Sequence, residues 1–194
     1  MQAKMTLSSY RKELIGVQGF VFALPIVSNF FDHHASIFPP MGDDSGPWKF
    51  VAMAIIGGSA LLPHFLLPKG HRNVVIGILF FLFVASGFSY LWLHTDYVVT
   101  IPRPAGSPGF VIRGTVRNPS LKAPYSTMSD EDLIQSSGQS DDALELAYSR
   151  PSLRANRAKV FSAYVASLVL LELFLGSCVA TDKLSAARSR TRRR

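Results

Sequence analysis

The sequence predicts an all-α polytopic membrane protein: four transmembrane helices, with a small α+β extramembrane loop (a β-hairpin plus short helices) between helices three and four. The first observation is the run 74–93, twenty positions without a charged side chain, which is long enough to cross the roughly 30 Å hydrocarbon core of a bilayer as a helix. The second is that three further runs, 14–31, 50–67 and 160–180, resemble it. The last three runs are apolar all round, whereas a helix on the core of a soluble protein has one apolar stripe.

The first run, 14–31, is the weakest of the four because Gln18, Pro25 and Asn29 interrupt it. An interfacial or re-entrant helix is one alternative, and a cleaved signal peptide with a basic start is another. The sequence that follows, 29–34, lacks the small residues of a cleavage site. We therefore expect a signal anchor that is retained and spans the membrane.

The second and third runs are joined by the short connection 68–73, which predicts an antiparallel helical hairpin. Proline and glycine in the first loop, 32–49, exclude regular structure there. Trp48 and Trp92 stand at helix ends, where tryptophan anchors a helix at the membrane surface.

The long loop 94–159 begins with two segments rich in β-branched residues, 97–101 and 110–116, separated by a proline- and glycine-rich turn. This pattern predicts a β-hairpin. An isolated two-stranded hairpin is barely stable in water, so we expect it to pack on the membrane helices, on lipid headgroups or on a second copy. Residues 118–127 are expected to form an irregular connector.

The rest of the loop is predicted to be helical. Ser129 can cap a short helix whose first residues are acidic, and Gly138 would end it. A second short helix is expected over 141–148. One continuous helix is then expected over about 152–180; at 1.5 Å per residue it is about 43 Å long, more than the membrane core, so its first turns should project as a basic stalk. The domains are an N-terminal membrane region 1–93, the loop 94–159, the fourth transmembrane helix 160–180 and a basic tail 181–194.

Basic residues predict the orientation, since cytoplasmic flanks of membrane helices are enriched in lysine and arginine. With four crossings, the two termini and the 68–73 connection share one side and hold eleven basic residues, against nine on the other side. Eight of those nine lie in the long loop, and the rule applies to short loops, so setting that loop aside leaves eleven against one. Both termini are therefore expected in the cytoplasm and the long loop outside, in a plasma or inner membrane. Four basic residues at the start of helix four are typical of a cytoplasmic flank, so the opposite orientation stays open.

Composition excludes several classes of site. The net charge of +7 lies mostly at the chain ends and beside the helices, which favours contact with anionic lipids over nucleic acid. A single cysteine, Cys178, excludes an intrachain disulfide and a cysteine metal site. The polar helix ends 32–34 and 94–96 carry histidine and aspartate at a spacing that matches no metal motif. No catalytic or nucleotide-binding motif is present, so we expect no enzyme, metal or cofactor.

Glu172 is the strongest single signal, because a carboxyl group near the middle of a membrane helix is costly. Its candidate roles are ion coordination, proton transfer or a polar lock between subunits; the alternative is a protonated side chain that only supports packing through a hydrogen bond. His64 in the second run is the candidate partner. A further set of side chains is expected to contact lipid headgroups or another anion: Arg103, Arg113, Arg117, Arg150, Arg154, Arg157 and Lys159.

The function expected from these features is that of a non-enzymatic integral membrane protein, a sensor or accessory subunit that presents the loop 94–159 to a protein partner or an anionic ligand. Homo-oligomers are expected because four helices give little internal cover to Glu172. Small residues at 57–60, at 85–87 and at Ser162, Ala163, Ala166 and Ser167 can form helix contacts, and those of helices two and four are the candidates for assembly. The alternative is a pore-forming or membrane-disrupting effector, for example of a bacterial defence system, or a transport component with Glu172 in a polar path.

Overall fold

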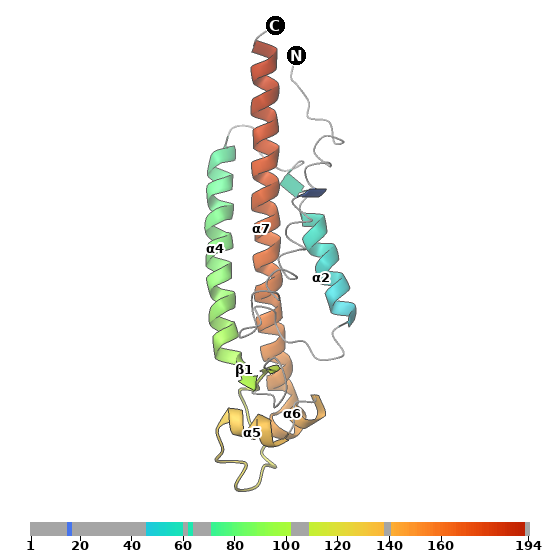
Figure 1. Cartoon of the computed structure of the whole chain (residues 1–194), viewed down its shortest axis with the longest axis vertical. Helices are drawn as coiled ribbons and strands as arrows, with labels where there is room; N and C mark the ends of the chain where they lie inside the picture. The colour runs from blue at the N-terminus through green and yellow to red at the C-terminus, as the bar shows by residue number, and fades with distance from the viewer. Residues whose placement is uncertain are drawn as a thin grey trace. The chain divides into compact units, whose positions relative to one another are not determined.

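The computed structural model describes residues 15–16, 46–59, 62–63, 71–101, 109–137 and 141–192, which are mostly helical with one small antiparallel sheet (Figure 1). The helices and strands are α2 (Gly46–Ser59), α4 (Arg72–Tyr97), β1 (Val98–Ile101), β2 (Gly109–Ile112), α5 (Asp130–Ser137), α6 (Asp141–Ala147) and α7 (Arg150–Arg192). The predicted combination of long helices, one hairpin and short helices is confirmed. The chain divides into two compact units, and the described residues of 88–164, called the loop domain below, form most of one of them.

Two described helices, α4 and α7, are long and apolar enough to cross a membrane by length and composition. They correspond to the third and fourth predicted spans. The second span is matched in its first part by α2, whose 14 residues are fewer than the roughly 20 that a crossing needs. The first span, apart from residues 15–16, lies outside the described residues. Four crossings therefore stay a prediction.

The last helix is longer than expected. α7 runs for 43 residues from Arg150 to Arg192, whereas the sequence pattern predicted an end near residue 180. The expectation was wrong because it equated the end of the apolar run with the end of the helix. Residues 181–192 contain alanine, leucine, lysine and arginine, which favour helix, and no glycine or proline. Pro151 sits in the first turn, where the lack of an amide hydrogen costs nothing.

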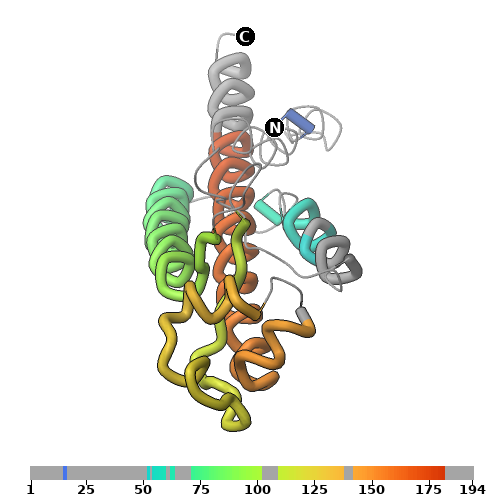
Figure 2. Tube along the Cα trace, turned by 60° about the horizontal axis from the view of Figure 1, so that its bottom comes forward, coloured from blue at the N-terminus to red at the C-terminus, as the bar shows by residue number. Residues whose placement is uncertain are grey.

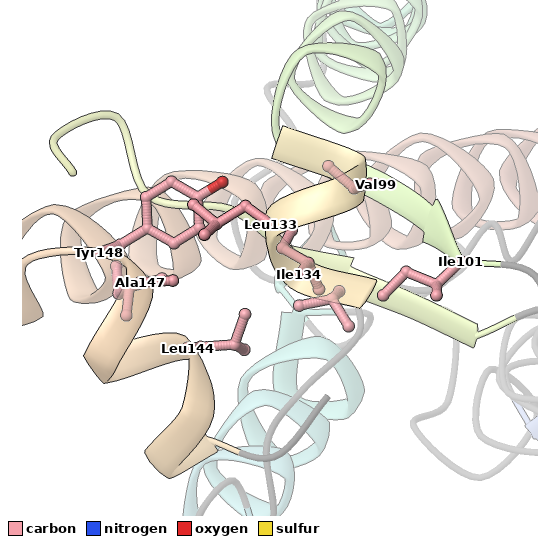
Figure 3. Packing of buried hydrophobic residues seen from close by; sticks show 9 residues of the cluster. Val99, Ile101, Leu133, Ile134, Leu144, Ala147 and Tyr148 are labelled. Carbon is pink, nitrogen blue, oxygen red and sulfur yellow. The ribbon is translucent and has the colours of Figure 1, made fainter. Parts of the chain in front are cut away.

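The hairpin is confirmed, with β1 paired antiparallel to β2 so that Val99 faces Val111 and Val98 faces Ile112. Because side chains alternate between the faces of a strand, these two pairs point to opposite sides of the sheet. Val99, Ile101 and Val111 belong to a buried cluster that also contains residues of α5 and α6. Figure 3 shows this cluster and labels its members from β1, α5 and α6, and Tyr148. Ile112 instead packs with Tyr90 of α4 and Val160 of α7.

Burial on both faces explains how a two-stranded sheet persists in this chain. Of the three expected partners of the hairpin, the predicted transmembrane helices are confirmed for one face, where Ile112 packs on α4 and α7. The other face of the hairpin is covered by nearby residues, which the sequence did not predict: Leu133 and Ile134 of α5 and Leu144 of α6 pack there and are almost fully buried. α5 begins as predicted: the Ser129 hydroxyl accepts a hydrogen bond of 3.1 Å from the Asp132 amide and donates one of 2.7 Å to its carboxylate.

α4 and α7 run antiparallel and side by side in both views of the chain (Figures 1 and 2). Outside the loop domain, the hydroxyl groups of Ser86 and Ser167 are 3.1 Å apart and the rings of Phe80 and Phe174 lie 5.4 Å apart. The interhelical hydroxyl pair satisfies two polar groups on otherwise apolar helices.

Candidate functional site

The polar centre of the loop domain is the carboxylate of Asp130, which accepts hydrogen bonds from three side chains. Arg113 donates from Nη1 at 2.6 Å, Arg117 from Nη2 at 3.0 Å and Tyr148 from its hydroxyl at 2.8 Å. These four residues are called the Asp130 cluster below. Both arginines form ion pairs with the carboxylate, and their side chains are about one third exposed, so the cluster lies at the domain surface rather than in its core.

The cluster joins three parts of the loop domain. Arg113 directly follows β2, and Arg117 lies in an isolated antiparallel bridge with Tyr148. Asp130 is the first residue of α5. The ion pairs therefore connect the segment after the hairpin to the start of α5, and the Tyr148 hydrogen bond adds the segment before α7.

The arginines also bind backbone carbonyl groups, which fixes their position. Arg113 donates from Nε and Nη2 to the carbonyl oxygen of Asp96, at 2.9 and 2.7 Å, and so ties the hairpin to the end of α4. Arg117 donates to the carbonyl oxygens of Ser126 and Met128 at 2.8 and 2.7 Å. The planar guanidinium group suits such multiple contacts, which the ammonium of lysine could not reproduce.

Burial and hydrogen bonding act in opposite directions on Asp130. Partial burial by itself would raise the pKa of the carboxyl group, but the hydrogen bonds from Tyr148, Arg113 and Arg117 outweigh it and hold that pKa below its ordinary value. Burial, and then the hydrogen bond to Asp130, raises the pKa of the Tyr148 hydroxyl. The cluster is therefore an ionised carboxylate with a neutral phenol at neutral pH.

The lowered pKa predicts acid sensitivity of the loop domain. A carboxyl group that is more acidic in the folded than in the unfolded chain stabilises the fold above its unfolded pKa, and this stabilisation is lost as pH falls from the ordinary value of 3.8 toward the folded pKa. Thermal unfolding measured from pH 7 down to pH 2 should show part of its loss of stability in this window. In Asp130→Asn that part should be missing. An unchanged pH profile in the variant would show that Asp130 contributes none of it.

Gly114 and Asn156 join the hairpin to α7. A Cβ atom at Gly114 would lie 2.5 Å from Cβ of Tyr148 and 2.7 Å from Oγ of Ser152, so only glycine fits there. The buried Asn156 side chain donates from Nδ2 to the carbonyl oxygen of Arg113 at 2.9 Å, and its amide lies within hydrogen-bond distance of the Thr115 hydroxyl. The start of α7 is thus fixed to the segment that carries both cluster arginines.

The predicted anion contacts take different positions in the structure. Arg113 and Arg117 come together on Asp130, so an internal carboxylate already occupies both. Arg150 pairs with Glu145 at 2.6 Å, and the ammonium of Lys159 lies 5.6 Å from the centre of the Tyr97 ring. Arg154 is exposed and Arg157 is half-buried. Arg103 lies outside the described residues, and contact of these side chains with an external anion stays a prediction.

Sequence reasoning missed Asp130, Tyr148, Gly114 and Asn156 as site residues. Asp130 was interpreted only as an acid at a helix start. Two arginines four positions apart, directly after a strand, were a signal that a carboxylate lies opposite them. The close approach of Tyr148 and Ser152 to Gly114 leaves no signal in the sequence, because it depends on how segments distant in the chain pack.

Glu172 lies in the second compact unit, which contains α2, α4 up to Gly87 and α7 from Val165. Its side chain is 0% exposed, and neither carboxyl oxygen has a hydrogen-bond partner among the described residues. The argument that oligomers are needed to cover Glu172 was wrong, since a single chain encloses it. The packing interpretation included a hydrogen bond to a neighbouring helix, and no described helix provides one. The candidate partner His64 lies outside the described residues.

No group of histidine, cysteine, aspartate and glutamate side chains suited to a metal ion occurs in the described ranges. Comparison with known proteins adds no relative: no protein family, no curated protein and no solved structure matches this chain.

Proposed function

We propose that this protein is a non-enzymatic integral membrane protein that presents the loop 94–159, the outer part of the loop domain, at one membrane surface, as a sensor or accessory subunit for a protein partner or an anionic ligand. The observation that carries the proposal is the exposure of α4. Of the most apolar 18-residue stretch of α4, only 6% is buried within the chain. Phe81, Phe88 and Trp92 are each at least 70% exposed, and a soluble protein rarely leaves such a continuous apolar surface in water.

The side chains of α4 and α7 near the two ends of the loop 94–159 are of the kinds found at a membrane surface. Trp92 is exposed, and its indole nitrogen donates a 2.7 Å hydrogen bond to Asp96, which leaves the ring apolar and its polar edge satisfied. Lys159 and Tyr97 lie together just beyond the apolar part of α7. Tryptophan, tyrosine and lysine are the side chains that favour the interface between hydrocarbon and water.

The loop domain has features of a binding module. Its buried core and the Asp130 cluster give it a defined shape, and it exposes both apolar and basic side chains. Val116 and Leu146 are exposed and lie on segments joined by the hydrogen bonds around the Arg117–Tyr148 bridge. Arg154 adds exposed positive charge nearby in sequence. These groups suit a protein surface or an anionic ligand, whereas the enclosed Glu172 lends less support to a pore.

Four crossings, self-association and a plasma or inner membrane location are part of the same proposal. Room for a neighbouring helix exists on α4, where a Cβ atom added at Gly77 or Gly87 would meet nothing within 4 Å. Small residues that leave a helix surface open allow close contact between helices in lipid.

Thiol labelling in intact cells tests both the crossing and the orientation. Single cysteines are placed at Ser126, which is exposed in the loop domain, and at Ser189 near the end of α7, each with Cys178→Ser. We expect an impermeant thiol reagent to label Ser126→Cys in intact cells and Ser189→Cys only after lysis, because the basic tail favours the cytoplasm.

The reverse labelling pattern would contradict the orientation but keep the crossing. Equal labelling of both positions in intact cells, or protection of both until lysis, would contradict a membrane-spanning α7. The Cys178→Ser chain without an added cysteine is the matched control, since it should remain unlabelled in both preparations.

A further inference from the structure

Glu172 is buried in a way that no contact of the described chain explains. The residue is 0% exposed, and both carboxyl oxygens lack a hydrogen-bond partner in the described ranges. It stands among leucine, phenylalanine, valine and alanine in the apolar part of α7. Buried polar groups are normally hydrogen-bonded, so an enclosed carboxyl group without a partner indicates a role that packing does not supply.

The carboxyl group lies on the side of α7 away from α4. Ser167 and Phe174 contact α4, and Glu172 follows the first by five positions and precedes the second by two. At about 100° per residue, Glu172 is turned roughly 140–160° from both. The interhelical hydroxyl pair therefore does not serve as its partner.

Among the side chains that the structure describes, no charged group lies close enough to compensate the carboxyl group. Among the side chains of this unit that the structure describes, at 15–16, 52, 54–59, 62–63, 71–87 and 165–181, the other ionisable ones are His71, its neighbour Arg72, and Cys178. The antiparallel contacts of α4 with α7 place Arg72 about ten residues along α7 from Glu172, roughly 15 Å along the axis. Cys178 lies six residues away, roughly 9 Å along the axis.

We propose that Glu172 is an intramembrane proton-binding site. An ionised carboxylate enclosed without a partner is strongly disfavoured, and binding a cation removes that cost. A metal cation would need several oxygen ligands, whereas the described surroundings offer one carboxyl group. A proton needs no further ligand. The inference rests on the proposed function only in placing α7 in the membrane.

Infrared spectroscopy of the full chain in detergent tests the site directly. At pH 7 the exposed carboxyl groups are ionised, so a protonated carboxylic acid should give an isolated carbonyl stretching band. We expect this band in the wild type and in Glu145→Gln, and its loss in Glu172→Gln. A wild-type spectrum without the band at pH 7 would overturn the proposal, and so would loss of the band on adding sodium ions.

An apolar carbodiimide gives a second measurement. Dicyclohexylcarbodiimide adds across the O–H of a protonated carboxyl group: the carboxyl oxygen bonds to the central carbon, the proton moves to nitrogen, and nothing leaves. We expect one added reagent molecule on the peptide that contains Glu172, at a rate that falls as pH rises. Modification of Glu172 at a rate that does not depend on pH would contradict a proton site. Modification of other carboxyl groups alone, together with a missing infrared band, would contradict it as well.

Glu172→Leu covers the case in which the glutamine variant fails to fold. Leucine is of similar size and needs no partner, so this variant should fold and should lack the infrared band. A failed test of the proton site can be distinguished from a failed test of the proposed function. The infrared band reports the proton whatever the orientation of α7, and the labelling of Ser126 and Ser189 reports the crossing whatever the state of Glu172.

Discussion

Asp130→Ala should lower the free energy of unfolding of the loop domain by about 2–3 kcal/mol, because hydrogen bonds to a charged group contribute about that much and partial exposure reduces the total. The substitution removes an acceptor used by Arg113, Arg117 and Tyr148 at once. It leaves the Tyr148 hydroxyl, on an otherwise buried ring, without its partner. The change is measured by thermal unfolding in detergent, with cleavage of the loop domain by a protease as the signal for unfolding.

The matched control is Glu145→Ala, which also removes a carboxylate from an ion pair in the same domain. Its partner Arg150 has a side chain that is 70% exposed, and exposed pairs contribute about 0–1 kcal/mol. We expect a change below about 1 kcal/mol. Equal effects of the two substitutions would show that the Asp130 cluster is an ordinary surface ion pair.

Gly114→Ala should destabilise the loop domain by about 1–3 kcal/mol, the usual cost of inserting a carbon atom into a packed site. The new Cβ would lie 2.5 Å from Cβ of Tyr148, an atom that cannot move without its backbone. The segment after β2 and the start of α7 must then separate, which also weakens the Asn156 hydrogen bonds. Unfolding should occur several degrees lower than in the wild type.

Gly77→Ala is the control for this substitution, since a Cβ atom at that position meets nothing within 4 Å. It should leave the unfolding of the loop domain unchanged. A Gly114→Ala protein with wild-type stability would show that Tyr148 and α7 shift apart at little cost.

The sequence predicted the hairpin, the Ser129 cap and the long helix well, because each depends on residues close together in the chain. β-branched runs, a capping serine and an apolar run act locally. The end of α7 was missed because the apolar pattern reports where a helix meets lipid, not where its hydrogen bonding stops. In the candidate site, the arginines Arg113 and Arg117 were found, but their partner Asp130 was not.

The reason for that gap is physical. Asp130 satisfies a local rule as an acid at a helix start, and nothing in its neighbourhood marks the long-range ion pairs. Glu172 was recognised because a carboxyl group in an apolar run breaks a local rule. Its enclosure within one chain depends on packing of distant segments, which periodicity and composition do not report.

The continuity of α7 has a geometric consequence for the contacts that its first turns make. The helix runs from Arg150, inside the loop domain, to Arg192 without an internal proline, a length of about 64 Å. Its hydrogen bonds set successive residues about 100° apart around the helix axis. Asn156 and Val160, four residues apart, therefore meet the segment of the hairpin from one face of the helix. Inserting one residue between them would turn one of the two away from that segment by about 100°.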